Sequence, residues 1–384
     1  MYKWIVKLSN MCYNNHMLYF DNASTTKISK KSLESYIKAS EDYFNPSSLY
    51  QPSVDVKKQI EDCREYFLKK FNAKPKSTFI FTGSATESNN AVLNAMITRK
   101  DKKYLISGGE HSSVYETAKK LKENGYNIIF VPLNKNGSVD IDKLIESVDE
   151  NVAFISIIHV SNETGAINDI ESIVKRAKQI NPNISIHSDG VQAVGKLNID
   201  LTKLGVDFYT ISAHKIHGPK GIGGLFISNV NKFKPFILGG GQEMNLRSGT
   251  ENTPAILAFK TALENIEQID YSKHKKAILD NINVDYYLVS DDSCVDNIIS
   301  ICFKGLRGET IEHIMETKGY LIGTGSACNS KAGHNRVLST IVKPDYLQGA
   351  IRISFDSEIS VENCVEMAKS INATINELKK RLNK

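Results

Sequence analysis

Residues 210–224 read Thr210-Ile211-Ser212-Ala213-His214-Lys215-Ile216-His217-Gly218-Pro219-Lys220-Gly221-Ile222-Gly223-Gly224. An apolar run over residues 207–211 predicts a short buried strand, so Lys215 falls just beyond a strand end and ahead of a glycine-rich turn. Burial disfavours the ammonium form of lysine, so this lysine is either paired with a charge or used as an amine that forms a Schiff base. A surface loop with scattered basic residues is the alternative interpretation.

The residues around the glycines exclude two nucleotide-binding motifs. A dinucleotide fingerprint continues into a helix, whereas the residues from Gly224 to Ile227 predict a strand. A Walker motif has Ser or Thr after its Gly-Lys pair, whereas Lys220 is followed by Gly221.

The composition is that of an ordinary soluble globular protein. With 384 residues, the chain is long enough for two domains with separate cores. The net charge of +5 arises from 48 basic and 43 acidic side chains that are interspersed. Since no basic run alternates with aromatic residues, we expect no direct binding of nucleic acid.

The cysteines and the apolar runs bear on the compartment. The six cysteines form no C-x-x-C pair, which argues against a zinc site or other metal site and against a disulfide-rich secreted scaffold. No apolar run is long enough to span a membrane, and Lys3, Lys7 and Asn10 make the first residues a poor signal peptide. We therefore expect a cytoplasmic protein that does not enter a membrane.

From Leu18 onwards, short runs rich in Ile, Val and Phe alternate with longer amphipathic stretches. This order predicts an α/β fold with a mostly parallel seven-stranded sheet covered by helices. The predicted strands are 78–82, 103–107, 127–131, 152–159, 184–187, 207–211 and 225–227, and the predicted helices are 85–97, 114–124, 141–148 and 170–180.

A second region follows a helical stretch over residues 253–269. Strands at 297–303 and 350–355 and helices at 310–318 and 361–382 predict a smaller C-terminal α+β domain. We expect a large cofactor-binding domain over residues 18–262 and a small domain over 263–384. Residues 1–17 are expected to be an N-terminal extension that packs on the small domain.

Polar clusters follow five of the predicted strands. Because ligands bind beyond the carboxyl ends of parallel strands, these clusters predict one shared cleft. The clusters are residues 83–88, 110–113, 161–165, 188–192 and 212–215.

The cleft combines an amine (Lys215), a carboxylate (Asp189), an imidazole (His111) and a helix start with a hydroxyl (Thr86), with Ser212 nearby. This set suits pyridoxal 5'-phosphate, whose phosphate binds at helix starts, whose aldehyde needs a lysine and whose ring nitrogen needs a carboxylate. Alternatively, Asp189 is a helix cap, Thr86 a turn residue and His111 a histidine with its hydrogen bonds satisfied.

Cys328 and Arg352 are the informative residues of the second region. The neighbours of Cys328 are small or polar, which predicts a mobile, exposed loop and a thiol that can act as a nucleophile. An incidental surface thiol is the alternative. Arg352 interrupts an apolar strand, and a buried arginine requires a carboxylate from the protein or from a substrate.

From about Leu18 to the C-terminus, the chain resembles the cysteine desulfurases of the iron-sulfur-assembly type, within the class V aminotransferase superfamily of fold-type I pyridoxal-phosphate enzymes. The resemblance rests on seven ordered motifs, at residues 19–26, 45–48, 81–90, 187–192, 212–215, 247–250 and 325–328. Glycine and serine stand at 83 and 84 in the reverse of the usual family order, and the segment after Cys328 also departs from the family pattern.

The resemblance implies a role for each matching residue. It implies that Lys215 is the Schiff-base lysine, that His111 stacks on the cofactor ring and helps move protons, that Asp189 pairs with the ring nitrogen, and that Gln192 contacts the phenolic oxygen. Ala85, Thr86, Ser212 and His214 would hold the phosphate. Thr250 would complete the phosphate site of a second subunit in a homodimer, Asn162 and Arg352 would hold the substrate carboxylate, and Cys328 would receive the sulfur.

The implied reaction converts L-cysteine to L-alanine and leaves a persulfide on Cys328, from which sulfur passes to an acceptor such as a scaffold protein or a tRNA-thiolation protein. Three alternatives stay open. A class V aminotransferase would have no use for Cys328, a selenocysteine lyase would prefer selenocysteine, and a non-catalytic scaffold would bind no cofactor.

Overall fold

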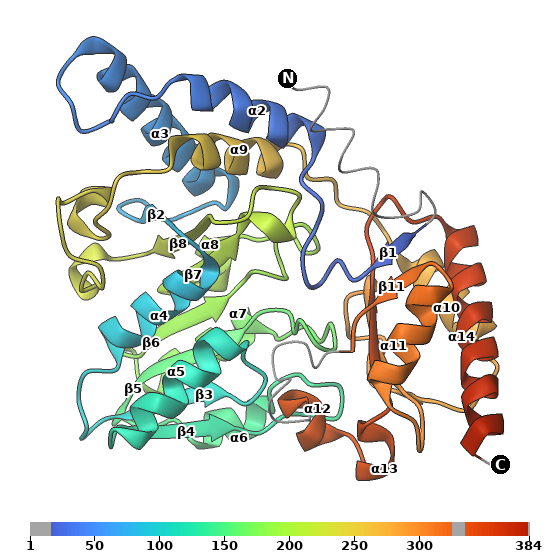
Figure 1. Ribbon diagram of the computed structural model, residues 1–384. Coiled ribbons are helices and arrows are strands. Elements are labelled where there is room, and N and C mark those ends of the chain that lie inside the picture. The colour runs from blue at the N-terminus through green and yellow to red at the C-terminus, as the bar shows by residue number, and fades with distance from the viewer. Residues whose placement is uncertain (1–16, 325–334, 383–384) are drawn as a thin grey trace.

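The computed structural model describes residues 17–324 and 335–382. Its larger lobe is built on a seven-stranded sheet (Figure 1). Six strands are parallel, and β8 runs antiparallel to both of its neighbours. The strand order is β2 (Thr78–Thr82), β8 (Gly223–Ile227), β7 (Phe208–Ser212), β6 (Ser185–Asp189), β5 (Val152–Ile158), β3 (Lys103–Ser107) and β4 (Asn127–Val131). This confirms the predicted α/β fold with a mostly parallel seven-stranded sheet.

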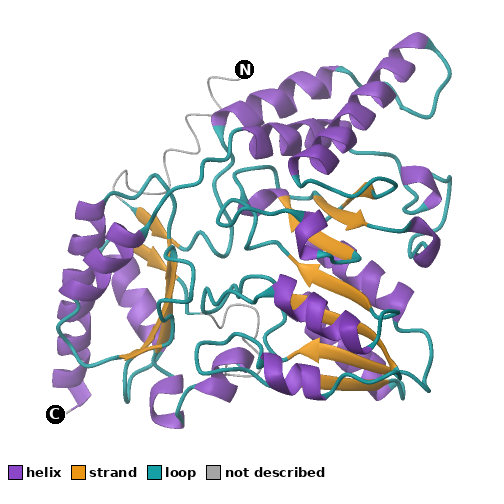
Figure 2. Ribbon diagram, turned by 180° about the vertical axis from the view of Figure 1, so that it is seen from behind, coloured by secondary structure: helices purple, strands orange, loops and turns teal. Residues whose placement is uncertain are grey.

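Helices cover both faces of the sheet because successive strand residues point to opposite sides (Figures 1 and 2). Phe79 and Phe81 of β2 join one core, while Ile80 joins the core on the other face. The second face is covered by α4 (Ala85–Met96) and α5 (Ser112–Glu123). The first face is covered by α3 (Gln51–Lys70), α6 (Ile141–Glu146), α7 (Ile170–Ile180), α8 (Leu201–Leu204) and α9 (Thr253–Glu264), and α2 (Lys30–Glu41) packs on α9.

The start of α4 shows how local chemistry fixes a turn beside the cleft. Ser84 is the N-cap, and its hydroxyl accepts a hydrogen bond from the amide of Glu87. The Glu87 carboxylate reaches back to the amide of Gly83 at 2.8 Å. These reciprocal contacts resemble a capping box, so the order Gly83–Ser84 still ends the strand and begins a helix.

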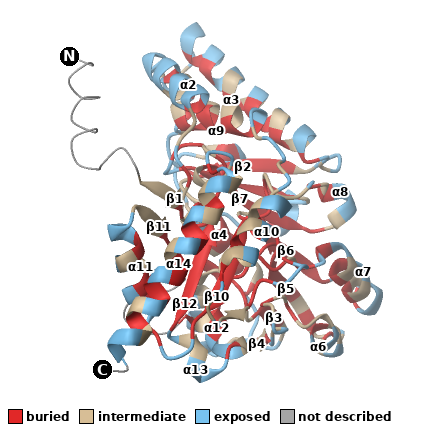
Figure 3. Ribbon diagram, turned by 90° about the vertical axis from the view of Figure 1, so that its right-hand side faces the viewer, coloured by how far each residue is buried: buried red, intermediate tan, exposed pale blue. Residues whose placement is uncertain are grey.

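The smaller lobe has its own core. Its antiparallel sheet contains β10 (Ile298–Cys302) between β12 (Ala350–Ser354) and β9 (Tyr287–Leu288). Helices α10 (Ser272–Asn281), α11 (Gly308–Thr317) and α14 (Val361–Leu382) pack against it, and α12 (Arg336–Ile341) and α13 (Pro344–Leu347) follow the gap in the described chain. Buried residues line the contact between the helices and this sheet (Figure 3).

The first described strand belongs with the C-terminal elements. β1 (Leu18–Phe20) pairs in parallel with β11 (Tyr320–Ile322), and Phe20 is fully buried in the small-lobe core. The chain then crosses to the large lobe through residues 21–26, which we call the crossing segment. The boundary at residue 18 stays a prediction, and residues 1–16 of the expected extension lie outside the described residues.

Two boundaries near the cleft differ from the prediction. The strand expected at 184–187 continues to Asp189, and the strand expected at 207–211 ends at Ser212. Lys215 then lies in a single helical turn, η1 (Ala213–Lys215). Further single turns are η2 (Val230–Lys232) and η3 (Glu243–Asn245). Within residues 17–324 and 335–382, no helix combines the length and the apolar character that a membrane span requires.

Candidate active site

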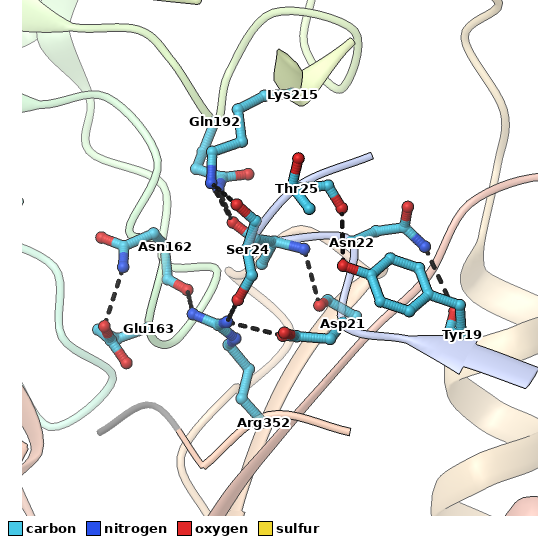
Figure 4. Close-up of polar contacts among 12 residues, drawn as sticks. Tyr19, Asp21, Asn22, Ser24, Thr25, Asn162, Glu163, Gln192, Lys215 and Arg352 are labelled. Atoms are coloured by element: carbon cyan, nitrogen blue, oxygen red, sulfur yellow. Dashed lines mark hydrogen bonds and ion pairs between the residues drawn. The ribbon is translucent and has the colours of Figure 1, made fainter. Parts of the chain in front are cut away.

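Lys215 meets the crossing segment. Its Nζ donates hydrogen bonds to the carbonyl oxygens of Ala23 at 2.5 Å and Ser24 at 2.6 Å (Figure 4). The amide of Thr26 donates to the carbonyl of His214 at 2.9 Å, which fixes the segment against the lysine-bearing turn. The crossing segment therefore forms one wall around the predicted Schiff-base lysine.

Gln192 shares an acceptor with Lys215. Its Nε2 donates to the carbonyl oxygen of Ala23 at 2.8 Å, and its Oε1 accepts from Nζ of Lys196 at 3.0 Å. Figure 4 shows the amide of Gln192 beside the end of Lys215. The structure thus brings together two residues predicted to contact the cofactor and adds Lys196, which sequence reasoning did not identify.

Asp189 and His111 are joined by two residues that the sequence analysis gave no role. Nδ2 of Asn89 lies 2.8 Å from Oδ2 of Asp189 and 2.8 Å from Oγ of Ser113. Oγ of Ser113 lies 2.9 Å from Nδ1 of His111. This chain of side chains fixes the positions of the carboxylate and the imidazole relative to each other. In the sequence, Asn89 falls within one of the seven family motifs, and Ser113 falls within one of the polar clusters that follow the strands. Both are therefore close to residues that the sequence analysis did assign a role.

His111 is a neutral imidazole in this setting. Burial lowers its pKa and Lys215 adds to the effect, while the charge of Asp189 opposes it. The backbone amide of Ser113 donates to Nδ1 at 3.2 Å, so Nδ1 is the acceptor and Nε2 carries the proton. His111 also caps α5 through this contact. The alternative in which Asp189 is a helix cap is wrong, because its Oδ1 accepts from the amide of Val191 in a turn and no described helix begins there.

Glu110 lies behind the same carboxylate. It is fully buried, and burial together with the charge of Asp189 raises its pKa well above the usual range. Its Oε1 lies 3.3 Å from the hydroxyl of Ser156. Arg336 of α12 donates to the carbonyl oxygens of Gly108 and Glu110, and its guanidinium lies 3.7 Å from the ring centre of Tyr115. The small lobe thereby holds the turn before His111.

The candidates for binding phosphate surround the start of α4. Thr82, Gly223 and Ser212 are opposite one another in neighbouring strands. A Cβ atom at Gly223 would lie 2.6 Å from the carbonyl carbon of Ser84, so only glycine allows β8 to approach this turn. Ser212 therefore lies near the start of α4, where Ala85 and Thr86 are the first two helical residues and their amides have no partner within the helix. This concentration of donors suits a phosphate.

His214 faces the crossing segment. Its Nδ1 lies 3.1 Å from Oγ1 of Thr25, and burial, assisted by Lys215, lowers its pKa to about 4. The imidazole is therefore neutral at neutral pH and can donate only one hydrogen bond. The predicted contact with phosphate requires the proton to be on the nitrogen that faces that group.

Arg352 is buried and already has partners within the protein. Its Nη2 donates to Oδ1 of Asp21 at 2.8 Å and to Oγ of Ser24 at 2.7 Å, and its Nη1 donates to the carbonyl oxygen of Asn162 at 2.8 Å (Figure 4). The side-chain amide of Asn162 donates instead to Glu163 at 2.9 Å. The two predicted substrate-binding residues do meet, through the backbone of Asn162, and Asp21 supplies the carboxylate that the sequence left unassigned.

Thr250 lies on a loop that is tied to the start of α4. Arg247 donates to Glu87 at 2.8 Å, and Glu87 is the residue that binds the amide of Gly83. A cavity of about 150 Å³ is lined by Gly83, Gly221, Arg247 and Thr250 among others. The Thr250 side chain is exposed on this surface.

The described residues fit pyridoxal phosphate. Asp189 is 2% exposed, yet its two oxygens accept hydrogen bonds from neutral donors, the amide of Val191 and the side chain of Asn89. A buried carboxylate with neutral donors suits a protonated ring nitrogen as its counter-ion. Lys215 and the start of α4 supply the amine and the phosphate donors. Cys328 lies outside the described residues.

The comparisons with known proteins agree on one family. The protein-family model described as Aminotransferase class-V matches residues 18–366. The cysteine desulfurase IscS 1 of Archaeoglobus fulgidus is 34% identical over 329 residues, which cover 82% of this chain and 85% of that protein. The solved structure of a NifS-like protein is 30% identical with a TM-score of 0.85, and the match covers 94% of this chain and 99% of that one. The structure entitled SspA in complex with cysteine is 28% identical with a TM-score of 0.78, over 88% of this chain and 98% of that one.

Proposed function

Since this chain belongs to the class V aminotransferase family and to its cysteine desulfurases, we propose that it converts L-cysteine to L-alanine and transfers the sulfur to Cys328. The observation that carries this proposal is the linked set of Asp189, Asn89, Ser113 and His111. It provides a carboxylate and an imidazole held at fixed positions. Cysteine as the substrate is supported by the related structure that was solved with cysteine.

Pyridoxal phosphate, when bound, supplies a ring that withdraws electrons from the bonds at the substrate Cα. Asp189 would hold the ring nitrogen in its protonated form, and Asn89 keeps the carboxylate in place. Lys215 would carry the cofactor and Gln192 would contact its phenolic oxygen. The phosphate would be held by Ala85, Thr86, Ser212 and His214.

Lys215 and His111 are the groups proposed to move the Cα proton. The carbonyls of Ala23 and Ser24 accept hydrogen bonds from the Lys215 amine and so hold it at the site whenever it is not bound to the cofactor. His111 is neutral because of burial, with its proton on Nε2, and so can donate a proton at one nitrogen. Its ring is oriented by Ser113.

The transfer of sulfur from the substrate to Cys328 needs no external oxidant or reductant. The thiolate of Cys328 attacks the substrate sulfur, an S–S bond forms, the C–S bond breaks, and the carbon takes up a proton to become alanine. The described cysteines are poor candidates for this role, because burial raises the pKa of Cys63, Cys294, Cys302 and Cys364 to about 12. Arg352, held beside Ser24, would bind the substrate carboxylate, with Asn162 next to it.

A homodimer is proposed from the surface of the large lobe. Large apolar side chains are exposed on the α2–α3 connection and on the loop that leads to Thr250, at the edge of the large lobe away from the small one (Figure 1). Exposed apolar residues clustered in this way mark an interface. They include Tyr43, Leu49, Tyr50, Phe236, Leu238 and Met244. Thr250 would then reach the phosphate site of the second subunit.

A sulfur acceptor and a cellular compartment complete the proposed function. A persulfide has to be passed on, so we propose a sulfur-acceptor protein as a partner, of the scaffold or tRNA-thiolation type, and iron-sulfur cluster assembly as one destination. The four free, unbridged thiols of the described chain agree with a reducing compartment, and we propose the cytoplasm.

The test is incubation of the purified holoenzyme with L-cysteine and a reductant, with alanine and sulfide measured together. Wild type should release both in equal amounts, and Lys215→Ala should release neither. Lys203→Ala is the matched control, since Lys203 is an exposed lysine paired with Glu171 at 3.3 Å. Transfer of the amino group to a keto acid in place of alanine release would favour an aminotransferase and overturn the proposal.

A further inference from the structure

Lys196 is a half-buried lysine that the reaction described above does not use. It follows Gln192 by four residues, and Gly195 between them has a φ of +86°, in the left-handed region. The chain turns back at this glycine, and a Cβ there would lie 2.2 Å from Cδ1 of Ile266. The turn brings Nζ of Lys196 to Oε1 of Gln192 at 3.0 Å.

The two contacts of Gln192 settle the orientation of its amide. An amide oxygen and nitrogen are nearly alike in shape, and only their partners tell them apart. A lysine ammonium only donates, so the atom that meets Lys196 is the oxygen. A carbonyl only accepts, so the atom 2.8 Å from the Ala23 oxygen is the nitrogen.

This orientation places the donor end of the amide beside the catalytic amine. The Ala23 carbonyl oxygen accepts from Nε2 of Gln192 and also from Nζ of Lys215 at 2.5 Å. Gln192 is only 2% exposed. If its amide were turned the other way, water could not supply the hydrogen bonds that the amide would lose. With its oxygen occupied by Lys196, Gln192 can present only N–H groups on this side.

We propose that Lys196 is a positioning residue that locks the amide of Gln192 so that its nitrogen faces the cofactor. This inference rests on the proposed function, because it is the phenolic oxygen of pyridoxal phosphate that requires a donor from Gln192. Without Lys196, the amide is free to turn, and its oxygen would then repel the phenolic oxyanion. Burial and the nearby Lys215 lower the pKa of Lys196 to about 7, and both the charged and the neutral amine can donate to Oε1.

The readout is the pH at which the visible absorbance of the bound cofactor changes in the holoenzyme without substrate. Loss of a donor to the phenolic oxygen favours the protonated state of the cofactor, so the midpoint should move to higher pH. Lys196→Met should raise the midpoint by about one pH unit, which is the shift expected when one buried hydrogen bond is lost. Lys196→Arg keeps a donor and should restore a midpoint near that of wild type.

A double-mutant cycle separates positioning from a direct effect of charge. Gln192→Leu alone should raise the midpoint, and adding Lys196→Met should raise it no further. Lys203→Met makes the same chemical change on an exposed helix and should leave the midpoint unchanged. If Lys196→Met does not fold, Lys196→Ala should give the same shift, since Lys196 lines a cavity of about 620 Å³ and needs no replacement volume.

Two outcomes would overturn the inference alone, given a wild type that binds pyridoxal phosphate and releases alanine. One is an unshifted midpoint in Lys196→Met. The other is a shift of full size in the Gln192→Leu background, which would mean that Lys196 acts by its charge. A wild type that binds no pyridoxal phosphate would overturn both the inference and the proposed function.

Discussion

Oδ1 of Asp21 lies 2.8 Å from Nη2 of Arg352, which joins the segment after the first described strand to the last strand of the small lobe. Both side chains are largely buried, so the arginine proposed to bind the substrate carboxylate is already one half of an ion pair. The guanidinium has five N–H groups, and a substrate carboxylate would compete with Asp21 for its charge.

Changes to this pair should act on KM for L-cysteine in opposite directions. Arg352→Gln removes the cation and should raise KM by about 10- to 100-fold, the worth of a charge-assisted hydrogen bond of about 1.5–3 kcal/mol. Asp21→Asn keeps the cation and removes a competing anion, so KM should fall. Steady-state kinetics on both variants would test this, and a similar rise in KM for both would show that Asp21 serves only to hold Arg352 in place.

Asn89 should be required for the chemical step. Asn89→Ala removes the donor that Asp189 and Ser113 share, and kcat should fall by about 10- to 100-fold because a buried carboxylate loses a hydrogen bond worth about 1.5–3 kcal/mol. Asn94→Ala is the matched control, since Asn94 is an exposed residue of the same helix whose side-chain amide donates to the carbonyl of Asn90. Equal activity of Asn89→Ala and Asn94→Ala would contradict the linkage described for Asp189 and His111.

The sequence predicts best those helices and strands whose buried residues form a clear apolar pattern within the element itself. β2, β3 and β4 have the predicted bounds because each contains a continuous apolar run with a polar residue at one or both ends. α7 has the predicted bounds because Ile170, Ile173, Val174 and Ala177 form one apolar stripe that follows the Asp169 cap. α2 was not predicted, since its buried residues are only Ser32 and Ala39. The pairing of β1 with β11 joins two three-residue strands about 300 positions apart. No pattern within either short segment predicts this pairing.

The residues of the candidate site also differ in how well the sequence predicts them. Lys215, Asp189 and His111 stand out because each follows a strand and carries reactive chemistry. Asn89 and Lys196 do not stand out, because an asparagine within a helix and a lysine in a turn are common on surfaces. Their roles depend on what packing brings to them, which for Asn89 is a carboxylate 100 residues further along the chain.

Hybrid dimers should show whether Thr250 serves the neighbouring subunit. Lys215→Ala and Thr250→Ala subunits are each expected to give a weak or inactive homodimer. In a mixed dimer, the site with an intact Lys215 would receive Thr250 from its partner, so activity should return to about half of wild type per dimer. Reassembly of differently tagged subunits followed by alanine measurement would test this. No recovery in the purified hybrid would mean that Thr250 acts within its own chain.

Acid should destabilise the fold through buried histidines. His187 is fully buried between Ser156 and Thr210, and burial lowers its pKa from 6.5 to about 3. A neutral histidine in the folded state contributes stability that is complete above pH 6.5 and is lost as the pH falls towards 3. Between pH 6.5 and pH 5 this loss is about 2 kcal/mol.

Chemical denaturation at several pH values would measure this dependence. His187→Asn should be less stable at neutral pH but should lose less free energy of unfolding on acidification. His313→Asn, which changes an exposed histidine, should keep the wild-type slope. A wild-type slope in His187→Asn would assign the acid sensitivity to other groups, such as His159, whose pKa burial lowers to about 4.

The central claim is that sulfur leaves cysteine as a persulfide on Cys328, and mass spectrometry of the holoenzyme after one turnover tests it most directly. With L-cysteine and no reductant, the peptide that contains Cys328 should gain one sulfur atom, and an equal amount of alanine should appear. Cys328→Ser should gain no sulfur and release no alanine, while Cys302→Ser should behave as wild type. Alanine release by Cys328→Ser at the wild-type rate, or sulfur carried by a different cysteine, would contradict the account.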